Sequence, residues 1–118
     1  MYGLPKDIDL NFFIGRTLVQ VCVGSNDLIL NFDGEVSVTV TSSVGCMGSS
    51  GKLTKYDDFR EAAPEVLMLL DRAVVSAKGD EGGTLALEYD GGRHLQLYDD
   101  TKQYESYTIR NGGKVIVV

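Results

Sequence analysis

The sequence predicts an α+β domain in which duplicated antiparallel β-meanders supply about seven or eight strands and one helix connects the two copies. The first observation is a pattern that occurs twice, with two leucines at alternate positions before an aromatic residue and an Asp-Gly pair: Leu28, Leu30, Phe32, Asp33 and Gly34, then Leu85, Leu87, Tyr89, Asp90 and Gly91. Each copy follows a valine-rich stretch that ends in glycine, at residues 19–24 and 74–79. Fourteen glycines against two prolines are typical of sheets with many tight turns.

The chain has the length of one ordinary domain. A chain of 118 residues can bury about two thirds of the surface that it exposes when unfolded, so it needs no disulfide or metal to fold. We therefore treat residues 1–118 as a single domain, with repeat halves at 17–41 and 73–99, a helix at 57–72 and a final hairpin at 104–118. The pattern of residues 9–14 does not distinguish helix from strand.

Strands are expected where apolar and polar residues alternate with a period of two, because one face of each strand is then apolar. The first strand should place Val19, Val21 and Val23 on one face. Two further alternating runs follow at residues 28–32 and 36–41, and the second of these has the clearest one-sided pattern.

The loop at each Asp-Gly pair must keep the apolar residues of the paired strands on the same face. A two-residue loop would turn the valines of the third strand to the other face, whereas a three-residue loop places Leu30 opposite Val38. The second copy obeys the same rule, with Leu87 opposite Leu95. Gly92 then occupies the loop position that requires a positive φ.

The two halves are joined by a stretch rich in glycine and serine, residues 42–51, which we expect to be a mobile surface loop. Either Asp57 or Asp58 can cap the helix that follows, and Pro64 lies in its first turn or splits it. The helix carries a stripe of apolar residues: Val66, Leu67, Leu69 and Leu70.

The final hairpin is expected to turn around residues 111–113, which places Ile109 opposite Val115 and leaves Ile116 and Val118 on the reverse face. Both faces then need cover, because four consecutive apolar residues on an open edge promote aggregation. The two meanders can supply this cover by packing against each other, and a second subunit in a homodimer can supply it as well.

The chain is acidic, with a formal net charge of −6 and a pI near 4.6. Its averaged field repels phosphate backbones and anionic headgroups, so we expect neither nucleic acid nor a membrane surface as a partner. Two interpretations of the acidity stay open, which are solubility and attraction to a basic partner.

Two cysteines, Cys22 and Cys46, are expected to be free thiols in a reduced, cytoplasmic protein, because no secretory segment precedes them. We expect Cys22 to be a small core residue and the less reactive thiol, since it lies in a predicted strand and Cys46 in the predicted loop. No apolar run approaches the roughly 18 residues of a membrane-spanning helix.

Neither a nucleotide nor a metal cofactor is expected. Residues 45–52 resemble a phosphate-binding loop, but five residues separate Gly45 from Gly51, and Leu53 stands where the loop needs a hydroxyl after Lys52. His94 is the only histidine and is expected to face solvent, so a zinc site would need carboxylates from distant segments.

One group of carboxylates and tyrosines is the densest polar and aromatic cluster in the chain. Three interpretations stay open: a solvated strand end, a recognition patch for a protein partner, and a catalytic carboxylate pair. Tyrosine offers a large contact area at low entropic cost and carboxylates attract a basic surface, so the recognition patch is our candidate site. Its residues are Tyr98, Asp99, Asp100, Tyr104, Glu105 and Tyr107.

The chain resembles a family of small bacterial proteins catalogued as a domain of unknown function. The resemblance rests on the two Asp-Gly hairpins, on the Tyr-Glu-Ser-Tyr segment at residues 104–107, on residues 3–5 and on the Ile14-Gly15 step before Thr17. In size and acidity such proteins are similar to the immunity proteins that neutralise polymorphic toxins. This analogy assigns no role to individual residues.

The leading hypothesis is a non-enzymatic binding protein of the cytoplasm, of the kind of an immunity-type inhibitor, that binds a basic protein partner. We identify no catalytic residue, because the sequence shows no nucleophile with a matching base. A small carboxylate-dependent enzyme is the first alternative, and a deep pocket with two carboxylates would favour it. A structural homodimer joined along its sheet edges is the second.

Overall fold

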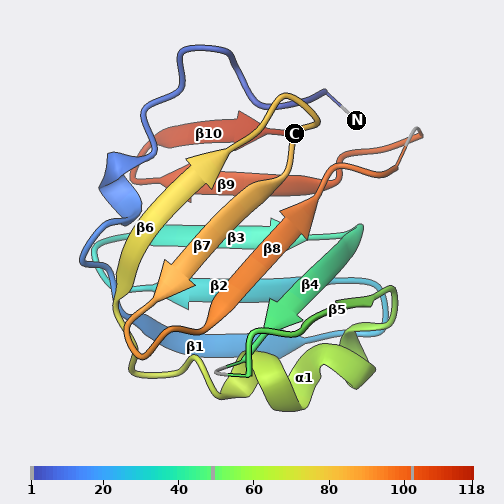
Figure 1. Cartoon of the computed structure of the whole chain (residues 1–118). Helices are drawn as coiled ribbons and strands as arrows, with labels where there is room; N and C mark the ends of the chain where they lie inside the picture. The colour runs from blue at the N-terminus through green and yellow to red at the C-terminus, as the bar shows by residue number, and fades with distance from the viewer. Residues whose placement is uncertain (1, 49, 102) are drawn as a thin grey trace.

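The computed structural model describes residues 2–48, 50–101 and 103–118. The described residues form ten β-strands, one α-helix and one short 3-10 helix, and the strands make two five-stranded antiparallel sheets (Figure 1). This architecture agrees with the α+β class, and the number of strands exceeds the predicted seven or eight. No helix in the described part of the chain is long and apolar enough to cross a membrane.

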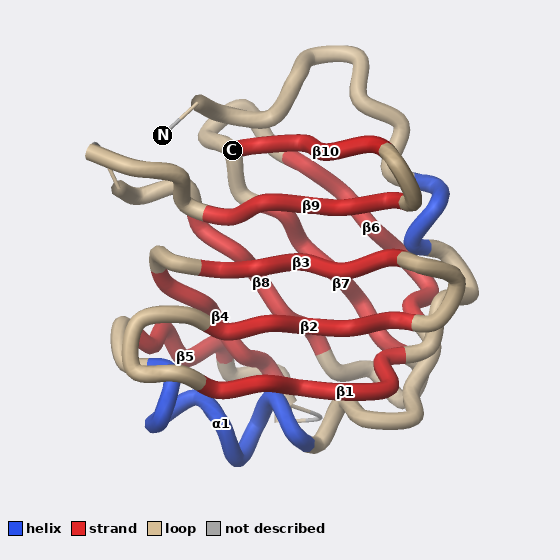
Figure 2. Tube along the Cα trace, turned by 180° about the vertical axis from the view of Figure 1, so that it is seen from behind, coloured by secondary structure: helices blue, strands red, loops and turns tan. Residues whose placement is uncertain are grey.

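Each sheet combines the meander of one half of the chain with the hairpin that follows the other meander. The first sheet has the order β1 (Leu18–Val23), β2 (Leu28–Phe32), β3 (Val36–Val40), β9 (Tyr107–Asn111) and β10 (Lys114–Val117). The second has the order β6 (Val74–Gly79), β7 (Leu85–Tyr89), β8 (His94–Tyr98), β4 (Ser43–Met47) and β5 (Leu53–Tyr56). The two sheets lie face to face, and the chain crosses between them after β3 and again after β8 (Figures 1 and 2).

The predicted register of both meanders is confirmed. Leu30 pairs with Val38 in the first copy and Leu87 pairs with Leu95 in the second, and all four side chains are fully buried between the sheets. Both Asp-Gly loops have three residues and end in a residue with positive φ, Glu35 in the first copy and Gly92 in the second. The two halves are therefore structural repeats, and the inner faces of the sheets cover each other.

The first strand of each meander carries the same irregularity. The register of β1 with β2 shifts between Leu18 and Gln20, and that of β6 with β7 shifts between Val74 and Ser76. The prediction that Val19 shares a face with the other valines of its strand is wrong, because the bulge turns its side chain outward and leaves it exposed.

The repeats begin earlier than residues 17 and 73, because the segments before β1 and β6 also match. Gly15 N donates to Val74 O at 2.8 Å, and Asp71 N donates to Leu18 O at 2.8 Å. Both donors have a positive φ. These reciprocal bonds, with the bridge between residues 17 and 73, join the two sheets at the ends where β1 and β6 start.

One helix, α1 (Phe59–Leu67), precedes β6 and covers the end of the sandwich beside β1 and β5 (Figure 2). Asp58 caps it, since its side chain accepts a hydrogen bond from Arg60 N at 2.9 Å. The predicted bounds of 57–72 are too long, because residues 68–72 form tighter turns that bring Asp71 to β1. Pro64 lies inside the helix without splitting it.

The stretch predicted to be a mobile loop contains β4 instead. Ser43, Val44, Gly45 and Cys46 are all buried, because β4 lies between β5 and β8 with α1 packed against it. Ser49, in the same stretch, lies outside the described residues. Both cysteines are free thiols, as predicted. Their predicted burial is reversed, because Cys46 is buried and Cys22 is partly exposed.

The predicted register of the final hairpin is wrong. Its turn has two residues, with Asn111 paired to Lys114, so that Ile109 faces Ile116 instead of Val115. A positive φ at Gly112 allows this tighter turn. Ile109 and Val118 are buried while Val115 is 56% exposed, so the packed sheets cover the inner face of the hairpin within one chain. The strand begins at Tyr107, and not at Tyr104.

Candidate functional site

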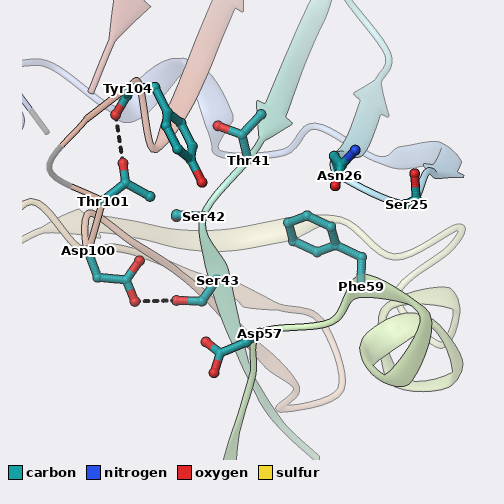
Figure 3. Close-up of a pocket in the computed structure, with 10 residues that line it drawn as sticks. All are labelled: Ser25, Asn26, Thr41, Ser42, Ser43, Asp57, Phe59, Asp100, Thr101 and Tyr104. Atoms are coloured by element: carbon teal, nitrogen blue, oxygen red, sulfur yellow. Dashed lines mark hydrogen bonds between the residues drawn. The ribbon is translucent and has the colours of Figure 1, made fainter.

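An open cavity of about 640 Å³ lies at the end of the sandwich where the chain crosses between the sheets. We call it the crossover pocket. It is built by the β1–β2 turn, the crossover after β3, the segment that leads into α1 and the crossover after β8 (Figure 3). The lining residues are Ser25, Asn26, Thr41, Ser42, Ser43, Asp57, Phe59, Asp100, Thr101 and Tyr104.

The lining is acidic and rich in hydroxyl groups. It carries two carboxylates, and no lysine, arginine or histidine is among the described residues that line it. Phe59 is buried and gives the pocket an apolar wall, whereas Tyr104 is 50% exposed at its rim. Figure 3 shows Phe59 across the hollow from the side formed by Asp100 and Thr101. Such a lining suits a group that is cationic, donates hydrogen bonds and has an apolar stem.

Asp100 is already bound by two donors. Its Oδ2 atom accepts a hydrogen bond from the Ser43 hydroxyl at 2.6 Å and contacts Lys55 Nζ at 2.9 Å. Partial burial of Asp100 raises its pKa, but the hydrogen bonds from Ser43 and Lys55 outweigh that effect and hold the pKa below its usual value. Asp100 is therefore ionised at neutral pH.

Asp57 is the second carboxylate of the pocket and differs from Asp100 in its contacts. It is exposed, and within the described part of the chain it makes no hydrogen bond or ion pair. The pocket therefore offers one carboxylate that is held in place and one that is available to a ligand.

Side-chain hydrogen bonds join the crossover after β8 to the N-terminal segment and to the crossover after β3. Asp99 accepts hydrogen bonds from Gly3 N at 2.8 Å and from the Ser106 hydroxyl at 2.6 Å. The Thr101 hydroxyl donates to Tyr104 O at 2.6 Å, and the Thr41 hydroxyl donates to Glu105 O at 2.5 Å. These bonds anchor the pocket wall to the N-terminal segment and to the crossover after β3, and such anchoring lowers the entropic cost of binding.

A family model described as "Family of unknown function (DUF6188)" matches residues 10–118. The chain belongs to this family. The match spans both meanders, α1 and the two exchanged hairpins, and it confirms the resemblance to a family of unknown function. Neither the curated proteins nor the solved structures that were compared with the chain gave a significant match.

The structure places the six candidate residues of this DUF6188 member in three different settings. Asp100 and Tyr104 line the crossover pocket, and Tyr98 lies next to it, with its ring centroid 5.2 Å from Lys55 Nζ. Glu105 is exposed outside the pocket.

Asp99 and Tyr107 have structural contacts instead. Asp99 ties the N-terminal segment to the crossover, as described above. Tyr107 is fully buried, and its hydroxyl donates to Gly83 O at 2.6 Å. Burial raises the pKa of Tyr107, so its hydroxyl stays protonated.

Sequence reasoning missed the residues that come from other segments. Ser25, Asn26 and Phe59 carried no signal of their own, and Asp57 was considered only as a helix cap. The sequence did offer a signal for Asp57, because Asp57 and Asp58 place two carboxylates at the start of the helix and the cap requires only one.

Metal binding and histidine chemistry receive no support from the described residues. No group of three or more His, Cys, Asp or Glu side chains in that part of the chain is arranged to hold a metal ion. His94 lies on the same strand face as Gln96 and Tyr98, as predicted, but it is half-buried instead of open to solvent, with its Nε2 atom 4.0 Å from Glu88.

Proposed function

We propose that this DUF6188 protein is a non-enzymatic binding protein of the cytoplasm that holds a basic segment of a protein partner in the crossover pocket, in the manner of an immunity-type inhibitor. The observation that carries the proposal is the composition of the pocket. An available carboxylate, Asp57, shares one cavity with the ionised Asp100, the buried Phe59 and the exposed ring of Tyr104.

Charge supports a basic partner. A net charge of −6 raises the local concentration of cationic molecules and speeds their association at low salt. Within the pocket, lysine and arginine can donate charge-assisted hydrogen bonds to the two carboxylates and further hydrogen bonds to the surrounding hydroxyls. Their aliphatic stems can pack on Phe59 and on Tyr104.

Size also favours a segment of a macromolecule over a single small cation. A cavity of about 640 Å³ is in the range of drug-sized ligands and exceeds one side chain. The pocket opens to solvent at the rim where Tyr104 lies, so a loop that protrudes from a partner can enter it without a change in the fold.

A small carboxylate-dependent enzyme is the second candidate, because two carboxylates do share one pocket. Catalysis by such a pair needs one carboxyl group whose pKa is raised so that it can donate a proton. The pKa of Asp100 is lowered instead, which disfavours it as the acid. The contacts of the pair therefore support binding better than proton transfer.

A capture experiment tests the proposal. The tagged wild-type protein and the variants Asp57→Asn and Tyr104→Ala are used to capture proteins from extracts of the native host. We expect the wild type to retain a basic protein that both variants retain at less than a fifth of that amount. Glu81→Gln is the matched control, because Glu81 is an exposed carboxylate outside the pocket.

The outcome that contradicts the proposal is equal capture by the wild type and both pocket variants. Capture of an acidic or neutral partner in place of a basic one would contradict it as well. Both substituted side chains are exposed, so the melting temperatures of the variants should stay close to that of the wild type.

A further inference from the structure

The crossover pocket borders a cation that belongs to the protein itself. Lys55 lies on β5 opposite Gly45 on β4. Because Gly45 has no side chain, the ring of Tyr98 occupies the space above it, where a Cβ atom at this position would collide with the Tyr98 hydroxyl. Lys55 Nζ lies 5.2 Å from the centroid of this ring and 2.9 Å from Asp100 Oδ2.

These contacts are those with which proteins recognise an ammonium or guanidinium group. A carboxylate supplies the charge, an aromatic face attracts the cation, and a hydroxyl orients the carboxylate. Ser43 performs the third role, because its hydroxyl donates to the same Oδ2 atom at 2.6 Å. Tyr98, Asp100 and Ser43 thus form a complete subsite for one cation, which we call the cation subsite.

The ion pair between Lys55 and Asp100 in the cation subsite is weak. The side chains of Lys55 and Asp100 are 52% and 37% exposed, so water screens their attraction and the pair is easily exchanged. Asp100 also lines the crossover pocket, so a ligand in the pocket reaches the carboxylate that Lys55 holds.

We propose that Lys55 occupies the cation subsite in the free protein and that a lysine or arginine of the partner displaces it from Asp100 and Tyr98 on binding. This inference rests on the proposed function. It adds that one partner group is a lysine or arginine side chain, and that Lys55 competes with this group for the cation subsite. Lys55 then lowers the affinity of the pocket for cations and favours partners that can replace it.

A purely structural role for Lys55 makes a different prediction. If Lys55 served only to hold β5 near the crossover, its removal would loosen the pocket wall and weaken the binding of a cationic ligand. The effect of one substitution on affinity therefore has opposite signs under the two interpretations.

The test uses a tetra-arginine peptide with blocked ends as the probe and follows the backbone amide chemical shifts of the 118-residue chain at constant ionic strength. We expect Lys55→Met to bind the peptide about threefold to fivefold more tightly than the wild type, which is the upper part of the range for release of an exposed ion pair. Lys52→Met is the matched control, since it removes the same charge from an exposed lysine on the same hairpin and should stay within about twofold of the wild type.

Two further variants test whether the gain in affinity depends on Asp100. In the Asp100→Asn background, Lys55→Met should lose most of its advantage, because the carboxylate that it uncovers is gone and only the weaker attraction between Lys55 and Asp57 remains. Lys55→Arg should behave like the wild type, since it keeps the competing cation.

The outcomes separate the two proposals. If Lys55→Met binds no better than Lys52→Met while the amides of Asp57, Thr101 and Tyr104 still shift, the displacement of Lys55 is refuted and the proposed function stands. If no variant shows shifts at these amides, the pocket does not bind cations and both proposals fail.

Discussion

Two buried tyrosines provide a test of how the sheets are packed. The Tyr107 hydroxyl donates to Gly83 O at 2.6 Å, whereas the Tyr89 hydroxyl is buried and has no hydrogen-bond partner among the described residues. Phe32 occupies the position in the first repeat that corresponds to Tyr89. The substitutions Tyr89→Phe and Tyr107→Phe each remove one hydroxyl, so they should change the free energy of unfolding in opposite directions.

The magnitudes follow from the state of each hydroxyl. A buried polar group without a partner costs about 1–3 kcal/mol, so Tyr89→Phe should raise the free energy of unfolding by about 1 kcal/mol. Tyr107→Phe leaves the buried carbonyl of Gly83 without its donor and should lower it by about 1–3 kcal/mol. For a domain of this size these changes correspond to shifts in melting temperature of about 3–6 °C per kcal/mol.

Urea unfolding followed by circular dichroism measures both changes, provided that the slope with denaturant stays equal to that of the wild type. Phe32→Tyr is the control, because it places an additional hydroxyl at the equivalent buried position and should destabilise the protein. The reasoning is refuted if Tyr89→Phe destabilises the protein as much as Tyr107→Phe does.

Four further predictions concern thiols, carboxylates and the C-terminal strand. Burial raises the pKa of Cys46 to about 12, so a disulfide reagent at mild pH should modify Cys22 in the native protein and Cys46 only after denaturation. Asp99→Lys should lower the melting temperature, because it breaks two hydrogen bonds that hold the crossover, and an unchanged melting temperature would contradict this. The folded protein holds the pKa of Asp100 below its ordinary value of 3.8, so the stability that its bonds contribute should be complete above pH 3.8 and be lost as the pH falls through the lowered pKa. Acid unfolding of the wild type and of Asp100→Asn measures this loss. Deletion of residues 115–118 should cost several kcal/mol, because it removes the buried Val118 and the outer strand of the first sheet, and a soluble product with an unchanged melting temperature would show that the strand is peripheral.

The parts of the fold that could be predicted from the sequence are local. Each meander is set by alternation within short strands and by three-residue loops, so the pairing of Leu30 with Val38 and of Leu87 with Leu95 follows from neighbouring residues alone. The exchange of hairpins between the sheets is not local. Val38 pairs with Ile109, and no pattern near either residue indicates the other. β4 was missed because it is buried on both faces and contains small residues, so it shows no alternation.

Only the local part of the candidate site could be predicted from the sequence, as with the fold. Asp100 and Tyr104 attracted attention because carboxylates and tyrosines are dense in one short segment. Asp57 and Phe59 reach the pocket only because α1 packs beside β4, which the topology determines. Density alone also selected Asp99, whose hydrogen bonds make it a structural residue.

The central claim, that the crossover pocket holds a basic segment of a protein partner, is tested most directly by amide hydrogen exchange of the protein alone and saturated with the captured partner. The account predicts slower exchange in the segments that build the pocket, at residues 25–26, 41–43, 57–59, 100–101 and 104, while the sheet faces away from the pocket and from Lys55 keep their rates. Protection confined to an outer sheet face or to the β10 edge, with these segments unchanged, would contradict it.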